Sequence, residues 1–463
     1  MRLLVAIAHH GTKNRPHLDR MLQAFRDMSH EVDVVLLTEV AKDLPVDVEQ
    51  RVGLPSANPW SLPFAHRPLF VDRMEDYDLF LYAEDDTLIE QRHIDTFLEL
   101  SSRVPEGYLP GLMRFEVAPA GERSMCTVHS YYRWEPGSVF EAGGLTFARF
   151  TNDHGACYLL TREQLRRAVA SGGYRLDPHE SRYDMLVSAA TDPYTDCGFT
   201  KIFCLERLED MLVHHLPNIY LGKLGITEEE FDLQLTAVSD IAKNQRSRRQ
   251  LFEPETSPQH VMWSKHVFPA PATGITEIVP RSAKRVVSVG AGDGRTEALL
   301  VDHGHQVRAI PVDHVIGASA ASRGVEVLEP SLDALADQDA HSADAVIALD
   351  SLPYFADPVA ALRACVRILT PGGRLVATVP DHRRYLLRNR LPGSRQTPVP
   401  RSWDDDGVHR TDARSLKSWC RSAGLTDVEI SHRHATRREP LGDGGFSAAI
   451  RGNTLLLTAR APR

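Results

Sequence analysis

Apolar and polar residues alternate along residues 1–225 in blocks that are typical of an α/β domain. Two apolar runs, at 2–8 and 31–39, have the length of buried strands, and the stretch 15–28 between them has the apolar spacing of an amphipathic helix. A third apolar run, at 77–86, ends in three acidic residues. The pattern predicts a β-α-β unit and a further parallel strand with acids at its carboxyl end.

The pattern changes after residue 225. Residues 226–280 begin with an acidic, helix-like stretch and continue through a run punctuated by prolines, which predicts a helical bridge and a linker. A second alternation of strand-like and helix-like blocks starts at residue 283 and continues to the C-terminus. We therefore predict an α/β protein with two domains, at 1–225 and 281–463, joined by 226–280.

Composition and charge narrow the classes of partner. The formal net charge of the 463 residues is -9, so the chain lacks the positive field that drives non-specific binding to nucleic acid or anionic lipid. No apolar run approaches the ~20 residues of a membrane helix, and the cysteines do not show zinc-binding spacing. We expect a cytoplasmic protein without a membrane span that acts on small molecules or neutral polymers. A homo-oligomer is compatible with this composition.

A glycine-rich turn follows the first strand of the second domain. The run at 285–289 leads directly into Gly290, Gly292 and Gly294, and a helix-like stretch follows. Glycines at a strand-to-helix turn let the backbone approach a ligand closely, and the helix N-terminus favours polar or anionic groups. The turn predicts a cofactor loop, and an ordinary tight turn is the alternative when these residues are taken alone.

Together with the segment 342–381, this loop resembles the class I S-adenosylmethionine-dependent methyltransferases. That segment contains an apolar strand, the turn D-S-L-x-x-F-x-D-P, a helix, and L-T-P-G-G-R-L before another strand. The resemblance covers the C-terminal domain and implies a Rossmann-like sheet. By matching position it assigns Gly290, Gly292, Gly294 and Asp350 to S-adenosylmethionine.

The sequence departs from this family where a ribose-binding acid is usual. The second strand of the domain ends at Pro311, and Asp313 is the nearest acid, so Asp313 is the candidate replacement. The acid that the family places near the adenine is also missing. Methyl transfer to a hydroxyl needs a base in addition to alignment. His382 and His409 are the candidate bases, and a solvated loop histidine is the alternative for each.

The acidic end of the 77–86 strand is the main candidate site of the first domain. Open α/β sheets bind ligands at the carboxyl ends of their strands. Carboxylates suit Mg²⁺ or Mn²⁺ held together with a diphosphate, so Glu84 and Asp86 are candidate metal ligands. A solvated acidic exit from the strand is the alternative.

This arrangement resembles the GT-A glycosyltransferases, whose D-x-D motif follows an apolar strand and holds a divalent metal against a nucleotide sugar. Here the motif reads Glu84-x-Asp86. The resemblance implies that Glu39, at the end of the second strand, faces the nucleotide. It also implies a late histidine as metal ligand, for which His214 and His215 are the candidates.

A catalytic carboxylate is expected near 174–184 by the same resemblance. Glu180 is the first choice and Asp184 the second, and surface ion pairing is the alternative for both. Such a carboxylate deprotonates the acceptor hydroxyl while the metal stabilises the departing diphosphate.

The two resemblances together imply a bifunctional enzyme. One domain transfers a sugar from a nucleotide-sugar donor with Mn²⁺ or Mg²⁺, and the other methylates the sugar or its acceptor, at oxygen, with S-adenosylmethionine. The alternative is an active glycosyltransferase whose methyltransferase-like domain has lost catalysis and serves as a scaffold. A nucleotidyltransferase is disfavoured, because the loop after the first strand lacks the glycine-rich basic character that holds a triphosphate.

Overall fold

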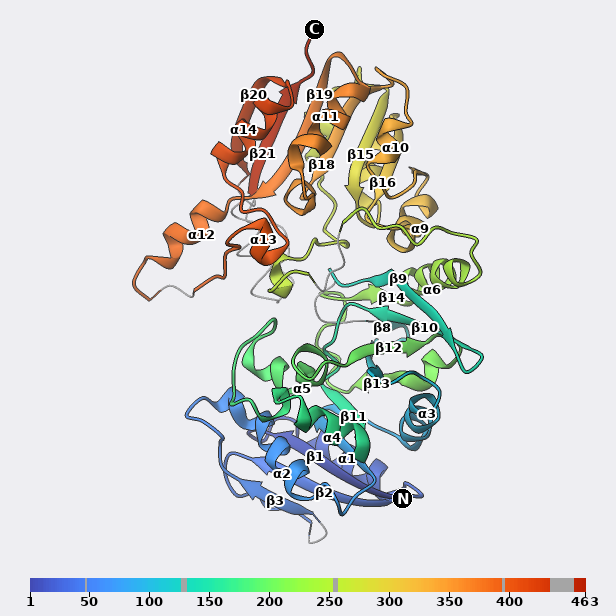
Figure 1. Cartoon of the computed structure of the whole chain (residues 1–463), viewed down its shortest axis with the longest axis vertical. Coiled ribbons are helices and arrows are strands. Elements are labelled where there is room, and N and C mark those ends of the chain that lie inside the picture. The colour runs from blue at the N-terminus through green and yellow to red at the C-terminus, as the bar shows by residue number, and fades with distance from the viewer. Residues whose placement is uncertain (46–47, 126–130, 253–256, 394–395, 434–453) are drawn as a thin grey trace. The chain divides into compact units, whose positions relative to one another are not determined.

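Strand β1 (Arg2–His9) is central to the first sheet of the structure, a computed structural model (Figure 1). This sheet has the order β11-β4-β1-β2-β3, and its neighbours are parallel except β11, which is antiparallel to β4. Residues 3–7 are fully buried, as expected for a parallel strand that is covered on both faces. The other strands are β2 (Glu31–Thr38), β3 (Glu49–Val52), β4 (Leu79–Glu84) and β11 (Cys157–Thr161). The strands and the helix predicted at 2–8, 15–28 and 31–39 are present.

The chain divides into two compact units, and each is described by itself. The first consists of Met1–His129 and Ser138–Glu228, and the second of Ser130–Gly137 and Glu229–Arg463. The structure describes all residues except 46–47, 126–130, 253–256, 394–395 and 434–453. The α/β class predicted from the sequence is confirmed.

Two further sheets accompany the first, in the orders β6-β12-β10-β9 and β14-β8-β7-β13-β5. Their strands are β5 (Thr87–Leu88), β6 (Tyr108–Pro110), β7 (Met113–Val117), β8 (Arg123–Met125), β9 (Trp134–Ala142), β10 (Leu145–Phe150), β12 (Thr200–Cys204), β13 (Leu212–His215) and β14 (Ile226–Thr227). The α-helices of the first unit are α1 (Arg15–Arg26), α2 (His66–Asp72), α3 (Gln91–Ser101), α4 (Arg162–Ala170) and α5 (Met185–Thr195). Three 3-10 helices lie at Pro59–Ala65, Gly173–Arg175 and Leu205–Met211.

The second unit is built on a seven-stranded sheet in the order β17-β16-β15-β18-β19-β21-β20. Its first five strands are parallel, and β21 is antiparallel to both of its neighbours. The strands are β15 (Arg285–Ala291), β16 (Gln306–Pro311), β17 (Glu326–Val327), β18 (Ala343–Leu349), β19 (Leu369–Pro380), β20 (Thr426–Arg433) and β21 (Thr454–Arg460). The carboxyl ends of the parallel strands meet at one edge, where ligands bind in such sheets.

The α-helices that follow β15 are α8 (Arg295–Asp302), α9 (His314–Ser322), α10 (Asp333–Ala336), α11 (Pro358–Ile368), α12 (His382–Asn389), α13 (Trp403–Asp406) and α14 (Ala413–Ser422). Helices α9, α10, α11 and α14 lie alongside this sheet in Figure 1, and α12 and α13 lie beyond one end of it. A 3-10 helix follows β18 at Leu352–Tyr354. None of the helices in the described ranges combines the length and the apolar character that a membrane span needs.

Residues 229–280 pack into the second unit. They contain most of α6 (Glu228–Ala242), a 3-10 turn at Val261–Trp263 and α7 (Ile275–Ile278). Ile275 belongs to the apolar cluster beneath the sheet, and Glu230 is paired with Arg323 at 3.2 Å. The domain limits predicted from the proline pattern stay a prediction, although the contacts group this segment with the C-terminal sheet.

Candidate functional site

The glycine-rich loop joins β15 to α8 at the carboxyl edge of the second sheet. Gly290 has φ 74° and Gly294 has φ 84°, values in the left-handed region that other residues rarely adopt. Gly292 does not have such a φ, and it is required for space, because a Cβ there would lie 2.4 Å from the Val267 carbonyl oxygen. That these glycines contact a cofactor stays a prediction.

The end of β18 lies against this loop. A Cβ on Gly290 would lie 2.6 Å from the Ser351 Cβ. Asp350 has φ 48°, and its carboxylate accepts a hydrogen bond from the Thr378 hydroxyl at 2.9 Å. Ser351 is fully buried, and its Oγ has no hydrogen-bond partner within the described part of the chain. A buried polar atom without a partner has hydrogen-bonding capacity that a polar ligand or an ordered water can use.

Asp313 is committed to contacts within the protein. One of its oxygens accepts hydrogen bonds from the N–H groups of Val315 (2.9 Å) and Ile316 (2.8 Å) at the start of α9. The other accepts a hydrogen bond from the Arg133 Nε at 2.9 Å, and neither side chain has exposed surface. Burial raises the pKa of Asp313 above its usual value, although the Arg133 charge opposes this. The predicted contact with a ribose stays a prediction.

The two histidines proposed as bases are held by the protein in different ways. His382 is buried, and its Nδ1 accepts a hydrogen bond from the Thr411 N–H at 3.0 Å. Burial lowers the pKa of His382 to about 4. His409 donates through Nε2 to the Ala356 carbonyl at 3.1 Å and stacks on Trp403. Their catalytic roles stay predictions.

Sequence reasoning missed an acid-histidine pair at the same edge. Asp381 follows β19 directly, and its Oδ2 lies 2.9 Å from Nε2 of His432, near the end of β20. The residues are 51 positions apart, so the only signal in the sequence was that each stands at the end of a strand.

In the first unit, the acids after β4 form a connected cluster with polar side chains from the β1 end. Asp85 accepts hydrogen bonds from His9 at 2.5 Å and from Asn14 at 2.7 Å, and Asp86 accepts one from Asn14 at 3.2 Å. The Glu84 Oε1 is buried without a hydrogen-bond partner among the described residues. Burial, and then the charge of Asp86, raise the pKa of Glu84 to about 8.

Alternation along β13 turns its two histidines to different partners. His215 Nε2 lies 3.5 Å from the Asp86 carboxylate, and its Nδ1 lies 2.5 Å from Glu116. Burial acts to lower the pKa of His215, but the hydrogen bonds to Asp86 and Glu116 outweigh it, so the pKa is raised. His214 pairs instead with Asn218 at 3.0 Å and stacks on Phe115. The metal ligation predicted for Glu84, Asp86 and these histidines stays a prediction.

A buried arginine, which sequence reasoning also missed, lies beside this cluster. Arg114, on β7, is 7% exposed, and its guanidinium makes no hydrogen bond or ion pair in the described ranges. Its positive charge acts to lower the pKa of the Glu84 and Asp86 carboxyls and of the His215 ring. A buried guanidinium with free donors suits a bidentate anionic ligand such as a phosphate.

The remaining predicted site residues of the first unit are separate from these contacts. Glu39 accepts hydrogen bonds from the Gly11 N–H at 3.0 Å and from Lys42 at 2.7 Å. Burial acts to raise the pKa of Glu39, but the Lys42 hydrogen bond outweighs it, so the pKa is lowered. Asp184 is exposed and caps α5 through the Val187 N–H at 3.1 Å, and Glu180 is exposed. Their roles stay predictions.

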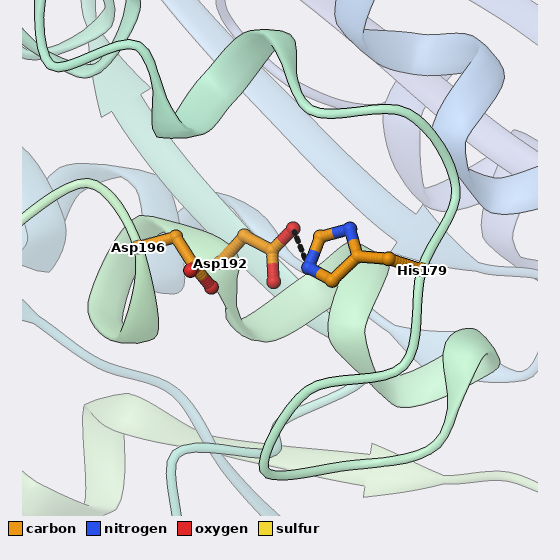
Figure 2. A group of neighbouring side chains, drawn as sticks. All are labelled: His179, Asp192 and Asp196. Atoms are coloured by element: carbon orange, nitrogen blue, oxygen red, sulfur yellow. Dashed lines mark ion pairs between the residues drawn. The ribbon is translucent and has the colours of Figure 1, made fainter.

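The described residues contain one further group with metal-ligand chemistry, formed by His179, Asp192 and Asp196. Figure 2 shows His179 turned toward Asp192, with their nearest polar atoms 3.6 Å apart. Asp192 is fully buried and already forms an ion pair with Arg67. Burial raises the pKa of Asp192 to about 6, although Arg67 opposes this. Because a cation here would meet the Arg67 charge, we interpret the group as a structural ion-pair network.

Comparison with known proteins concerns the second unit. The family described as a methyltransferase domain matches residues 263–430. A ubiquinone biosynthesis O-methyltransferase of Xylella fastidiosa is 34% identical over 168 residues, which are 34% of this chain and 67% of that protein. One of Pseudomonas fluorescens is 27% identical over 186 residues, 38% of this chain and 78% of that protein.

Among solved structures, an S-adenosylmethionine-dependent methyltransferase of Mesorhizobium loti has 20% sequence identity and a TM-score of 0.33. The match covers 41% of this chain and 98% of that one. The sequence matches lie on the sheet whose strand ends carry the glycine-rich loop, Asp350 and Ser351. Residues 263–430 therefore form a methyltransferase domain with a Rossmann-like sheet, and through it the chain belongs to the methyltransferase family.

Proposed function

We propose that the second unit transfers a methyl group from S-adenosylmethionine to an oxygen atom of a small-molecule acceptor. The observation that carries this proposal is the fully buried Ser351 Oγ beside the Gly290 turn, which has no hydrogen-bond partner in the described part of the chain. The relatives named above, which are called O-methyltransferases, support oxygen as the methylated atom.

The residues at this edge fit such a cofactor. The absence of side chains at Gly290 and Gly292 lets the loop pack directly against Ser351 and the Val267 backbone, which fixes the loop at the strand ends where such sheets bind ligands. The Ser351 hydroxyl has hydrogen-bonding capacity left, and the Asp350 carboxylate, which accepts one hydrogen bond from Thr378, has further acceptor sites. S-adenosylmethionine supplies an electrophilic methyl group when it is bound. The protein orients the acceptor, excludes water and removes the hydroxyl proton.

Ser351→Ala tests this proposal. We expect the variant to bind S-adenosylmethionine about five- to tenfold more weakly, because one hydrogen bond contributes about 1 kcal/mol. Its thermal stability should be unchanged, since the hydroxyl has no hydrogen-bond partner among the residues that the structure describes. Titration calorimetry measures the affinity and a melting curve the stability.

Ser342→Ala is the matched control. Its Oγ is also buried without a partner among the described residues, but it precedes β18, at the opposite end of the strand. We expect the Ser342→Ala variant to bind S-adenosylmethionine with the affinity of the wild type. If the wild type binds neither S-adenosylmethionine nor S-adenosylhomocysteine at millimolar concentration, the proposed activity is wrong and a scaffolding role takes its place.

For the first unit we propose nucleotide-sugar binding and sugar transfer. The observation in favour is the combination of Asp86, which follows β4, and Arg114 of β7, whose charge acts on Asp86 and whose guanidinium makes no hydrogen bond or ion pair with the described residues. Carboxylates that hold Mn²⁺ or Mg²⁺ and a guanidinium that contacts phosphate oxygens are complementary to a nucleoside diphosphate. With both units active, the chain is a bifunctional enzyme that transfers a sugar and a methyl group.

Arg114→Gln tests the diphosphate assignment. We expect the affinity for UDP or GDP to fall about ten- to a hundredfold, because a hydrogen bond to a charged group contributes about 1.5–3 kcal/mol. Mn²⁺ should strengthen nucleotide binding to the wild type and not to Asp86→Asn. Calorimetry with each nucleotide, with and without Mn²⁺, gives both results. Arg166→Gln, an exposed arginine of the same unit, is the control. Equal nucleotide affinity in Arg114→Gln and the wild type would contradict the assignment.

A further inference from the structure

The carboxyl edge of the second sheet carries an acid-histidine pair that the proposed methyl transfer has not yet used. In β19, Thr378 lies opposite Leu349, the last residue of β18, and Asp381 follows three positions later. Across the sheet, Pro380 pairs with Thr454 of β21, and Thr454 pairs with Arg433 of β20. His432, the neighbour of Arg433, therefore stands at the same edge as Asp350 and Ser351.

The geometry of the pair is that of an oriented base. Asp381 is 6% exposed, and one of its oxygens lies 2.9 Å from the His432 Nε2. Its other oxygen, Oδ1, is buried and has no hydrogen-bond partner among the described residues. The His432 side chain is 35% exposed, and its second ring nitrogen, Nδ1, makes no hydrogen bond with the described residues. A carboxylate that accepts a hydrogen bond from one ring nitrogen sets the tautomer in which the other nitrogen is the proton acceptor.

The other histidines of this edge do not have this arrangement. The ring nitrogen of His382 that faces Thr411 accepts an N–H, and the residue is buried. His409 gives its Nε2 proton to a backbone carbonyl and lacks a carboxylate partner in the described ranges. Of the three histidines at this edge, His432 is the one whose ring lies against a carboxylate in the described structure.

We propose that His432 is the general base of the methyl transfer and that Asp381 positions it. This inference rests on the proposed function of the second unit. The acceptor O–H bond breaks and its proton passes to the His432 Nδ1, while the Nε2 proton stays hydrogen-bonded to Asp381. The acceptor oxygen forms the new bond to the methyl carbon, and the C–S bond of the donor breaks to leave a neutral thioether. The proton is then released to water.

His432→Gln is the principal test, with the full chain and catechol as the hydroxyl probe, because catechol is not ionised in neutral solution and ionisation of its hydroxyl changes its ultraviolet spectrum. We expect the turnover number for its methylation to fall at least a hundredfold, in the range that general bases contribute. The affinity for S-adenosylmethionine should stay within about twofold of the wild type, because no residue assigned to the cofactor is changed. Asp381→Asn should reduce turnover about tenfold, since the amide no longer fixes the tautomer.

The pH profile separates a base from a structural residue. Wild-type turnover should decrease toward acid, because a protonated imidazole cannot accept a proton, and His432→Gln should lack this decrease. The charged groups that the described structure places against His432 are Asp381 and, through it, Arg384, whose Nε lies 3.8 Å from the Asp381 carboxylate. Arg384→Gln should keep the decrease toward acid.

Two controls make the outcomes distinct. His303→Gln removes an exposed histidine that directly follows α8 and should leave turnover unchanged. Ionisation of the probe, bound with S-adenosylhomocysteine, should appear in the wild type and be lost in His432→Gln. Turnover above a third of the wild type in His432→Gln, or a bound probe that does not ionise in the wild type, would overturn the assignment. Absence of cofactor binding in the wild type would instead overturn the proposed function.

Discussion

Arg133→Met is expected to lower the free energy of unfolding of the second unit by about 3–5 kcal/mol. Arg133 and Asp313 form an ion pair at 2.9 Å, and neither side chain has exposed surface. Removal of the guanidinium leaves the Asp313 carboxylate buried without its counter-charge. An uncompensated buried charge is strongly destabilising because the folded state no longer offsets the lost hydration of the carboxylate. Urea unfolding, followed by circular dichroism, measures the change.

The pH dependence of this variant follows from the raised pKa of Asp313. Burial already holds that pKa above its usual value, and loss of Arg133 raises it further. A carboxyl with a higher pKa in the folded state than in the unfolded state destabilises the fold as pH rises. The loss of stability should therefore be larger at pH 8 than at pH 5.

Asp313→Asn in the same chain is the matched control. An amide oxygen still accepts the hydrogen bonds from the N–H groups of Val315 and Ile316, and it carries no charge. The double variant should be more stable than Arg133→Met alone, because the uncompensated charge is gone. A double variant that is no more stable than the single one would contradict this account.

Gly292→Val is expected to weaken S-adenosylmethionine binding about ten- to a hundredfold and to reduce methyl transfer accordingly. A Cβ on Gly292 would lie 2.4 Å from the Val267 carbonyl oxygen and 3.1 Å from its carbonyl carbon. Backbone atoms cannot rotate away, so the loop or the segment around Val267 must shift, and overpacking of this kind costs about 1–3 kcal/mol. The hydrogen bond from the Asp293 N–H to the same oxygen, at 2.9 Å, is then strained. Calorimetry measures the affinity.

Gly137→Ala is the control for this effect. Gly137 belongs to the second unit, and a Cβ there would lie at an ordinary contact distance of 3.6 Å from the Gln250 side chain. We expect the cofactor affinity of Gly137→Ala to equal that of the wild type. If the affinity of Gly292→Val for S-adenosylmethionine is within threefold of the wild-type affinity, the loop does not form the binding site.

Local patterns were sufficient to predict several elements of this fold. The apolar runs at 2–8 and 31–39 became β1 and β2, and residues 3–7 of β1 are fully buried, as a parallel strand covered on both faces requires. The turn at Gly290 was predictable because its left-handed φ, 74°, favours glycine. These features depend on neighbouring residues, and neighbouring residues are what a sequence displays directly.

The partners of the charged side chains were decided by the tertiary structure. His215 meets Glu116 from 99 positions away, Asp381 meets His432 from 51, and Arg133 meets Asp313 from 180. Strand order and register bring these residues together, and both depend on how whole faces pack. Burial was decided in the same way, so that His382, a candidate base by its position after a strand, is enclosed, whereas His432 is accessible beside a buried carboxylate.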